Sequence, residues 1–278
     1  MNIAFWSEED GCGTTSGMAA VASVCSDIWK MRTILIQSSN QEGDLCQKLG
    51  IGTQAEKMWD ALYGLAGDKR LTAAVLAEYM VPVVRGRMYY LPQGEYKKRK
   101  KYPEAVKEGM RQVVHSAEQM ADLTFVDCGS GRDEMSDFLL AQADVVVVNI
   151  SQERQNLDAY FQDRHIFRGN VIYLINQYHQ ESIYNKKNLN RLFRLREEEL
   201  AVIPNNPVFR HVSGKGKTER FIRRHSCCRT FDHQYYFMQE LMQTTEMILK
   251  AARLTGLEKK KGEKYTRRKG IKYNQGQE

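Results

Sequence analysis

The residues that suggest chemistry lie near the start of the chain, in residues 7–16. An apolar run over residues 2–6 predicts a buried strand, and the small residues over 17–24 predict a helix. The loop between them contains Gly11 and Gly13. A glycine-containing turn between a strand and a helix directs backbone N–H groups and the positive end of the helix dipole at one point. The segment therefore predicts an anion-binding loop.

The loop lacks one residue that phosphate chemistry uses. In the pattern G-x-x-x-x-G-K-[ST], the Lys contacts the phosphates and the following hydroxyl reaches Mg²⁺. Here Thr14 stands at the Lys position and Thr15 at the hydroxyl position. Glu8, Glu9 and Asp10 place three carboxylates beside the expected polyphosphate, and like charges at that range disfavour binding. A plain strand–turn–helix, with glycines for tight geometry, is the alternative interpretation.

The rest of the chain alternates apolar runs with helical patterns. Runs over 2–6, 32–37, 88–92, 123–127, 144–150, 171–176 and 200–204 predict strands, and residues 44–50, 54–66, 70–80, 103–120 and 232–254 predict helices. Continuous apolar runs indicate strands buried on both faces, hence an α/β fold whose mostly parallel sheet of about seven strands is flanked by helices on both faces. Ligands bind such sheets at the carboxyl ends of the strands, where Asp127, Asn149 and Asn176 fall.

Charge is concentrated at the end of the chain. The 278 residues have a formal net charge of +7, and residues 259–272 hold eight Lys and Arg with one Glu, so the remainder is neutral. That neutrality argues against a DNA-binding surface on the globular part. We expect one domain over 1–257 and a basic, disordered tail over 258–278, which contacts an anionic membrane or nucleic acid through residues 259–272.

Location is predicted from what the sequence lacks. It has no apolar run of membrane-spanning length, no signal peptide and no C-x₂-C pair among its six Cys. We therefore expect a cytoplasmic protein, with peripheral contact to a membrane through the basic tail.

The order of these motifs resembles the MinD/ParA family of deviant Walker ATPases, a P-loop NTPase-like family, over residues 1 to about 255. The family loop K-G-G-x-G-K-[ST]-[ST] lies over residues 9–16, and Asp127-Cys128-Gly129 lies over the Walker B strand. Asn176 matches the Asn that faces adenine, and Ile203-Pro204-Asn205 matches the turn near the base. The resemblance implies a Mg²⁺ ion at Thr15 and Asp127, and a nucleotide held by Gly11, Cys12, Gly13, Thr14, Thr15, Ser16, Asn176 and Pro204.

The departures from the family pattern affect catalysis most. Glu9 replaces the signature Lys, Thr14 replaces the phosphate-loop Lys, and Gln37 and Ser39 replace the two Asp of the second strand. Phosphoryl transfer depends on positioning and charge stabilisation, so these losses remove most of the mechanism. We expect a degenerate member without assigned catalytic residues, which binds ATP or ADP with Mg²⁺ weakly or not at all. A homodimer of this chain would not need ATP.

Three functional hypotheses follow. The first is a pseudo-ATPase that acts as a localisation or assembly factor, similar to the TadZ/CpaE group, which positions the Tad/Flp pilus secretion machine through partners at the membrane. The second is an active ATPase of the partition or cell-division type, in which Lys215 or Lys217 compensates for the missing cation. Those two Lys otherwise belong to a basic surface loop that continues into Arg220, Arg223 and Arg224. The third is a nucleic-acid-binding protein acting through its tail and residues 97–101. The missing Lys pair favours the first.

Overall fold

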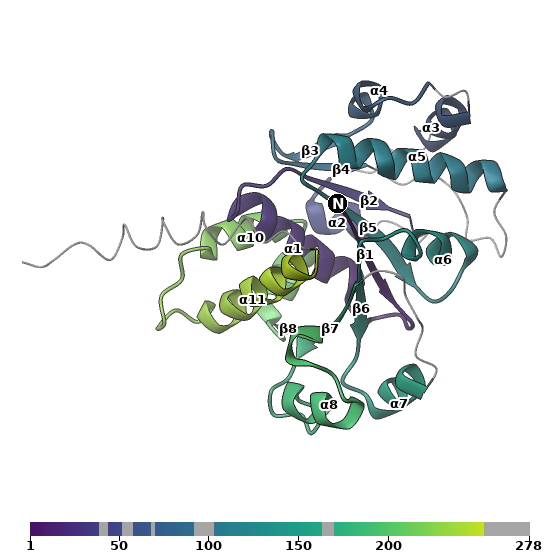
Figure 1. Cartoon of the computed structure of the whole chain (residues 1–278). Helices are drawn as coiled ribbons and strands as arrows, with labels where there is room; N and C mark the ends of the chain where they lie inside the picture. The colour runs from purple at the N-terminus through teal and green to yellow at the C-terminus, as the bar shows by residue number, and fades with distance from the viewer. Residues whose placement is uncertain (39–43, 52–57, 68–69, 92–102, 163–169, 253–278) are drawn as a thin grey trace, which may run out of the picture.

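The computed structural model describes residues 1–38, 44–51, 58–67, 70–91, 103–162 and 170–252. This part of the chain forms one sheet between two layers of helices (Figure 1). The strands lie in the order β3-β4-β2-β5-β1-β6-β7-β8, and all neighbours are parallel except β3 and β4. Their bounds are β1 Asn2–Ser7, β2 Thr33–Gln37, β3 Val81–Val84, β4 Met88–Leu91, β5 Leu123–Ser130, β6 Val145–Ile150, β7 Asn170–Tyr178 and β8 Leu200–Pro204. The predicted α/β fold with a mostly parallel sheet is confirmed.

Strand β3 is an eighth strand that the apolar pattern did not predict. It lies at the edge of the sheet, pairs antiparallel with β4, and contains Pro82. Proline has no backbone N–H to donate, so an edge position, where one side of the strand needs no partner, accommodates it. Its side chains are exposed or half-buried, which explains why no continuous apolar run marks it.

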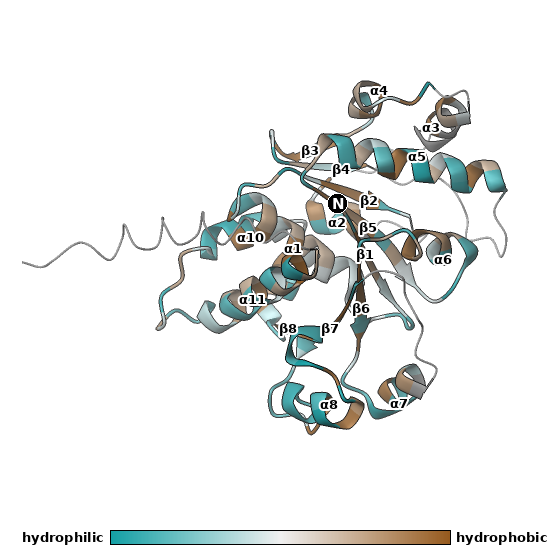
Figure 2. Cartoon of the chain, viewed as in Figure 1, coloured by the Kyte–Doolittle hydropathy of each residue, from teal (hydrophilic) through white to brown (hydrophobic). Residues whose placement is uncertain are grey.

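The two faces of the sheet carry two separate hydrophobic clusters. Side chains alternate along β1, so that Ile3 and Phe5 join one cluster while Ala4 and Trp6 join the other. Helices α1, α2, α9, α10 and α11 cover the first face, and helices α3 to α8 cover the second. Figure 2 shows the central strands as hydrophobic and the peripheral α8 as mostly hydrophilic. Both faces are therefore closed, as the uninterrupted apolar runs predicted.

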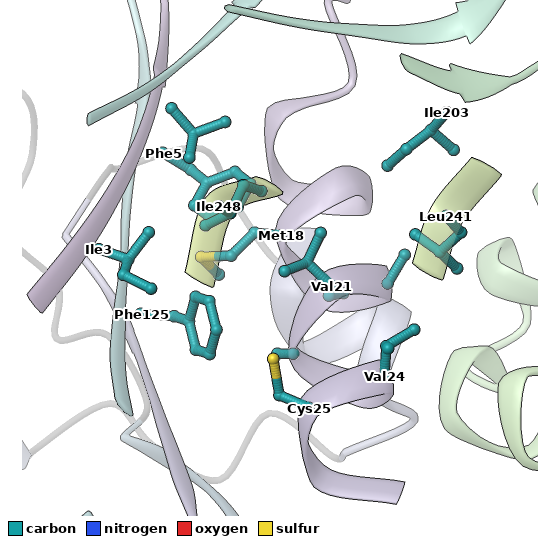
Figure 3. Close-up of a cluster of buried hydrophobic side chains, with 14 of the residues drawn as sticks. Ile3, Phe5, Met18, Val21, Val24, Cys25, Phe125, Ile203, Leu241 and Ile248 are labelled. Atoms are coloured by element: carbon teal, nitrogen blue, oxygen red, sulfur yellow. The ribbon is translucent and has the colours of Figure 1, made fainter. Parts of the chain in front are cut away.

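Helix α1 (Thr14–Asp27) is the buried centre of the first layer. It packs between Ile3, Phe5 and Phe125 of the sheet on one side and Leu241 of α11 on the other (Figure 3). Almost all of its residues are buried, and many of them are Ala, Gly or Ser, whose small side chains let neighbouring backbones approach. This packing fixes the helix whose N-terminus carries the predicted anion-binding loop.

The predicted helices are present within the described residues. The remaining helices are α2 Asp44–Leu49, α3 Met58–Gly67, α4 Ala73–Glu78, α5 Glu104–Met120, α6 Glu134–Leu140, α7 Arg154–Gln162, α8 Lys186–Phe193, α9 Pro207–Gly214, α10 Thr218–His225 and α11 Tyr235–Ala251, with a 3₁₀ turn at Glu197–Glu199. The expected basic loop through Arg220, Arg223 and Arg224 is wrong, because these residues lie on α10, which buries Phe221 and Ile222. In the described part, no helix is both long and apolar enough to cross a membrane.

Some predictions fall on residues outside those that the structure describes. They concern Ser39, the basic residues 97–101 and the tail over 258–278.

Candidate functional site

The loop between β1 and α1 has the backbone of an anion-binding turn. Gly11 and Gly13 take left-handed conformations, with φ of 82° and 78°, which side chains disfavour. Gly13 is the N-cap of α1, and its carbonyl accepts the first helical hydrogen bond, from Gly17 N at 2.8 Å. The helix thus begins at Thr14, three residues earlier than the small-residue pattern predicted. Residues of its first turn line a cavity near the carboxyl ends of the strands.

Thr14 occupies the position where the phosphate-loop pattern requires Lys, and its side chain is engaged within the loop. It is buried, and its hydroxyl donates to Ser7 Oγ at 3.0 Å. Ser7 Oγ in turn donates to the carbonyl of Glu9 at 2.8 Å. These two bonds hold the turn in shape with neutral groups, so the loop itself supplies no side-chain cation.

Thr15 and Asp127, the predicted metal ligands, are in direct contact. The Thr15 hydroxyl donates to Asp127 Oδ2 at 2.7 Å, and Asp127 Oδ1 accepts from Gly129 N at 3.0 Å. Asp127 is fully buried behind Thr15. A hydroxyl beside a carboxylate is an oxygen donor set that suits Mg²⁺. The two residues would fit a Mg²⁺ ion that Thr15 and the phosphate of a ligand hold, with Asp127 on the buried side of Thr15. Among the described residues, no group of three or more His, Cys, Asp or Glu could hold a metal ion.

A cavity of about 270 Å³ opens beside this loop, at the carboxyl ends of the strands. Of the predicted site residues, Gly11, Gly13, Thr14, Thr15, Ser16, Asn176 and Pro204 line it, whereas Cys12 and Asp127 do not. The structure therefore brings most of the predicted set to one place.

The three carboxylates of the loop do not line the cavity. The Asp10 carboxylate accepts a hydrogen bond from Ser130 Oγ. Burial raises the pKa of Glu9, and the charges of Glu153 and Glu8 raise it further. The expected repulsion of a polyphosphate by these carboxylates stays a prediction.

Cys12 lies in the loop without lining the cavity. Burial, followed by the neighbouring carboxylates, raises the pKa of its thiol to about 11. A thiol that stays protonated at neutral pH is a poor nucleophile. Cys12 therefore contributes backbone geometry to the loop and no thiolate chemistry.

Asn176 supports the loop from the end of β7. Its Nδ2 donates to the carbonyl of Cys12 at 3.0 Å and to Asn149 Oδ1 at 2.6 Å. A Cβ atom added to Gly13 or Gly17 would lie 2.9 Å or 2.6 Å from this side chain, so glycine is required at both positions. The side chain thus connects the loop to β6 and β7, while its contact with a base stays a prediction.

Two cations of the cavity were missed in the sequence. Lys48 of α2 and Arg210 of α9 line it, together with Gln177, whose Oε1 accepts from Arg210 Nη1 at 3.2 Å. Asn206-Pro207 is an N-cap followed by proline at the first helical position, a signal that predicts a helix after β8 and so places Arg210 near its start. No comparable signal marks Lys48.

The Gly214-Lys215-Gly216-Lys217-Thr218 segment has a structural role. A Cβ atom on Gly216 would lie 2.4 Å from Gly50 Cα, and one on Gly50 would lie 2.4 Å from the carbonyl oxygen of Gly216. The segment therefore packs its backbone on the end of α2. Lys215 and Lys217 are not among the residues that line the cavity.

Comparison with known proteins shows which fold the chain has, and it finds no close relative by sequence. No family model matches the chain, and no curated protein matches it. A ParA family ATPase from Chlorobium tepidum superposes with a TM-score of 0.69 at 15% identity, covering 88% of this chain and 96% of that one. The cell-division ATPase MinD of Pyrococcus furiosus gives 0.64 at 15%, covering 90% and 98%. MinD of Pyrococcus horikoshii, solved with Mg-ADP, gives 0.63 at 16%, covering 90% and 96%. The chain has the fold of the ParA and MinD ATPases.

Proposed function

We propose that this chain is a degenerate member of the MinD/ParA family, which positions a protein partner without hydrolysing ATP. Its closest functional type is the TadZ/CpaE group, so the partner belongs to a membrane-associated machine such as a Tad/Flp pilus. The fold shared with ParA and MinD ATPases supports the family. The altered loop supports the loss of turnover.

The observation that supports the proposal most directly is that Thr14 stands in place of the phosphate-loop Lys and is hydrogen-bonded within the loop. Its hydroxyl is bonded to Ser7, and the loop over residues 7–16 contains no Lys or Arg. In phosphoryl transfer, positioned charge on the transferring group supplies most of the catalysis. Glu9 has the wrong sign to contact the phosphates of a second copy, so a homodimer would rest on contacts other than a bridging nucleotide.

An ATPase assay with matched variants tests this proposal. Thr14→Lys restores the cation, and Thr14→Met restores its length without charge. We expect the unmodified chain and both variants to release phosphate at the rate of a blank, because restoring one cation does not restore the second-strand Asp residues. Thr14→Lys should nevertheless bind ATP about ten- to a hundredfold more tightly than Thr14→Met, since a charge-assisted phosphate contact is worth about 1.5–3 kcal/mol. Sustained turnover by the unmodified chain would overturn the proposal.

A localisation assay tests the positioning role in the cells that produce this protein. Fluorescent fusions of the unmodified chain and of Thr14→Met should occupy the same position, because that position does not depend on hydrolysis. Diffuse fluorescence of the unmodified fusion would contradict the role.

The second hypothesis, an active ATPase with a compensating Lys215 or Lys217, has less support. Both residues lie in the turn that packs on Gly50 and neither lines the cavity. Nucleic-acid binding through the tail over 258–278 concerns residues outside the described part of the chain.

A further inference from the structure

The cavity beside the loop is lined by positive charge. Of its described lining residues, Lys48 and Arg210 are the ones with charged side chains, and both are cations. Neither belongs to the loop: Lys48 is on α2 and Arg210 is on α9. The same cavity receives the N-terminus of α1, whose dipole also favours an anion. Three independent elements thus place positive potential in one space.

A backbone contact sets the positions of the two cations relative to each other. Helices α2 and α9 pack together, and the turn after α9 touches the end of α2 through Gly216 and Gly50. Both glycines have left-handed backbones, with φ of 70° and 69°. Lys48 lies two residues before Gly50, and Arg210 lies six before Gly216. The tight glycine contact therefore fixes the two helices at the separation that places both cations in one cavity.

Gln177 orients the second cation. It is a non-glycine residue with a φ of 54°, at the point where the register between β7 and β8 shifts. Its Oε1 accepts from Arg210 Nη1 at 3.2 Å, and both side chains line the cavity. A guanidinium held by a neutral amide keeps its full charge for another partner. Arg210 is thus directed at the cavity by a bond that does not neutralise it.

The remaining surface of the cavity suits an organic group. Ile203, Pro204 and Phe209 provide an apolar wall, and the hydroxyls of Thr14, Thr15 and Ser16 lie by the loop. The volume of about 270 Å³ is near the lower limit for small-molecule sites, which span about 300–1,000 Å³. The chemistry is that of a small ligand that carries both a phosphate group and an apolar or aromatic group.

We propose that Lys48 and Arg210 bind the phosphate of a small phosphorylated ligand, a nucleoside phosphate, in place of the absent loop Lys. This inference rests on the proposed function, because it takes the cavity as the ligand site of a chain that does not hydrolyse what it binds. It deepens that function by naming the chemical class of the ligand. The cations come from helices outside the loop, so a loop motif alone does not report them.

Binding measurements on the purified full chain test this assignment. Calorimetry would use three probes: pyrophosphate for the phosphate group alone, adenosine for the organic group alone, and ADP for both. The variants are Lys48→Met and Arg210→Met, which remove charge but keep length, with Lys48→Arg and Arg210→Lys as conservative replacements. Lys215→Met is the matched control, because it removes one cation from α9's end without touching the cavity.

We expect each Met variant to weaken ADP and pyrophosphate binding about tenfold, equivalent to about 1.4 kcal/mol, and the double variant about a hundredfold. Adenosine binding should not change, the conservative replacements should recover most of the affinity, and Lys215→Met should match the unmodified chain. Arg210 is exposed and Lys48 half-buried, so the variants should melt as the unmodified chain does.

Three results would overturn the inference. One is equal phosphate affinity in the unmodified chain and both Met variants; another is an equal loss in Lys215→Met, which would indicate a general effect of net charge. Failure of the unmodified chain to bind ADP or pyrophosphate at millimolar concentration would also overturn it, while leaving the non-hydrolysing role intact. Turnover of ATP by the unmodified chain would overturn that role and leave the cation assignment standing.

Discussion

Two adjacent threonines allow the strength of the bond to Asp127 to be measured. Thr14 is 7% exposed and Thr15 is 6% exposed, and each donates one hydroxyl hydrogen bond. Thr15 donates to a carboxylate at 2.7 Å, and Thr14 donates to the neutral Ser7 hydroxyl at 3.0 Å. Replacing either by Val removes the hydroxyl with little change in shape. The pair therefore compares a charge-assisted bond with a neutral one at neighbouring positions.

The structure sets the expected magnitudes. Loss of a bond to a charged group costs about 1.5–3 kcal/mol, and loss of a neutral bond costs about 0.5–1.5 kcal/mol. At about 2 °C per kcal/mol for a domain of this size, Thr15→Val should lower Tm by about 3–6 °C and Thr14→Val by about 1–3 °C. Thr15→Ser keeps the hydroxyl and should stay within about 2 °C of the unmodified chain.

Denaturant unfolding at pH 7, without nucleotide or Mg²⁺, is the assay, with thermal melting as a second measurement. Equal losses for Thr14→Val and Thr15→Val would refute the reasoning, because they would show that Asp127 gives Thr15 no advantage over a neutral acceptor. A larger loss for Thr14→Val would show in addition that the bond to Ser7, and not the contact to β5, holds the loop in place.

Two further predictions concern the opposite end of α1 and the basic tail. Burial raises the pKa of Glu219, with hydrogen bonding to Asp27 and the charge of Asp27 adding to the shift, so the folded chain binds this proton more tightly than the unfolded chain. The cost of ionising Glu219 is therefore absent below its ordinary pKa of 4.5 and grows as the pH rises through the raised value, and the charges of Arg223 and Arg220 offset part of it. The change in Tm on Glu219→Gln should therefore be more positive at pH 7 than near pH 4, and an equal or more negative change at pH 7 would contradict this. Truncation after Leu257 should change Tm by less than about 2 °C. It should sharply reduce binding to anionic vesicles or DNA at low salt, because each Lys or Arg near such a surface contributes about 1 kcal/mol. A fall in Tm of about 5 °C or more would show that the tail packs on the domain.

The fold was predictable because its signal is local. Residues 123–127 and 144–150 are mostly apolar, and β5 and β6 are buried along their whole length. Strand β3 was missed because Pro82 and exposed neighbours give no run, and α10 was missed because its Arg residues mask the buried pair Phe221 and Ile222. Neither segment contains an uninterrupted apolar run. The buried residues of α10 do recur at helical spacing.

The candidate site was predictable where an ordered set of motifs along the chain covers it. The loop and Asp127 were found because a motif orders them along the chain. Lys48 and Arg210 are 162 residues apart in the sequence, and they line one cavity because α2 and α9 pack together at the contact of Gly50 with Gly216, which no local pattern encodes. The loop carboxylate of Asp10 bonds to Ser130, a cavity residue that lies 120 positions later in the chain, and the sequence did not indicate this contact.

Where the cations are held determines what a site of this kind can do. A Lys on the phosphate loop lies on the group being transferred, so its contact strengthens as charge develops in the transition state. The proposed contacts of Lys48 and Arg210 come instead from α2 and α9, outside that loop. Contacts that stabilise ground state and transition state equally improve affinity without raising turnover. Hydrogen bonds from Thr15 to Asp127 and from Asn176 to the carbonyl of Cys12 hold the loop in its shape. The two proposals are therefore compatible. Phosphate binding requires positive charge anywhere in the cavity, whereas hydrolysis requires positive charge at the group being transferred.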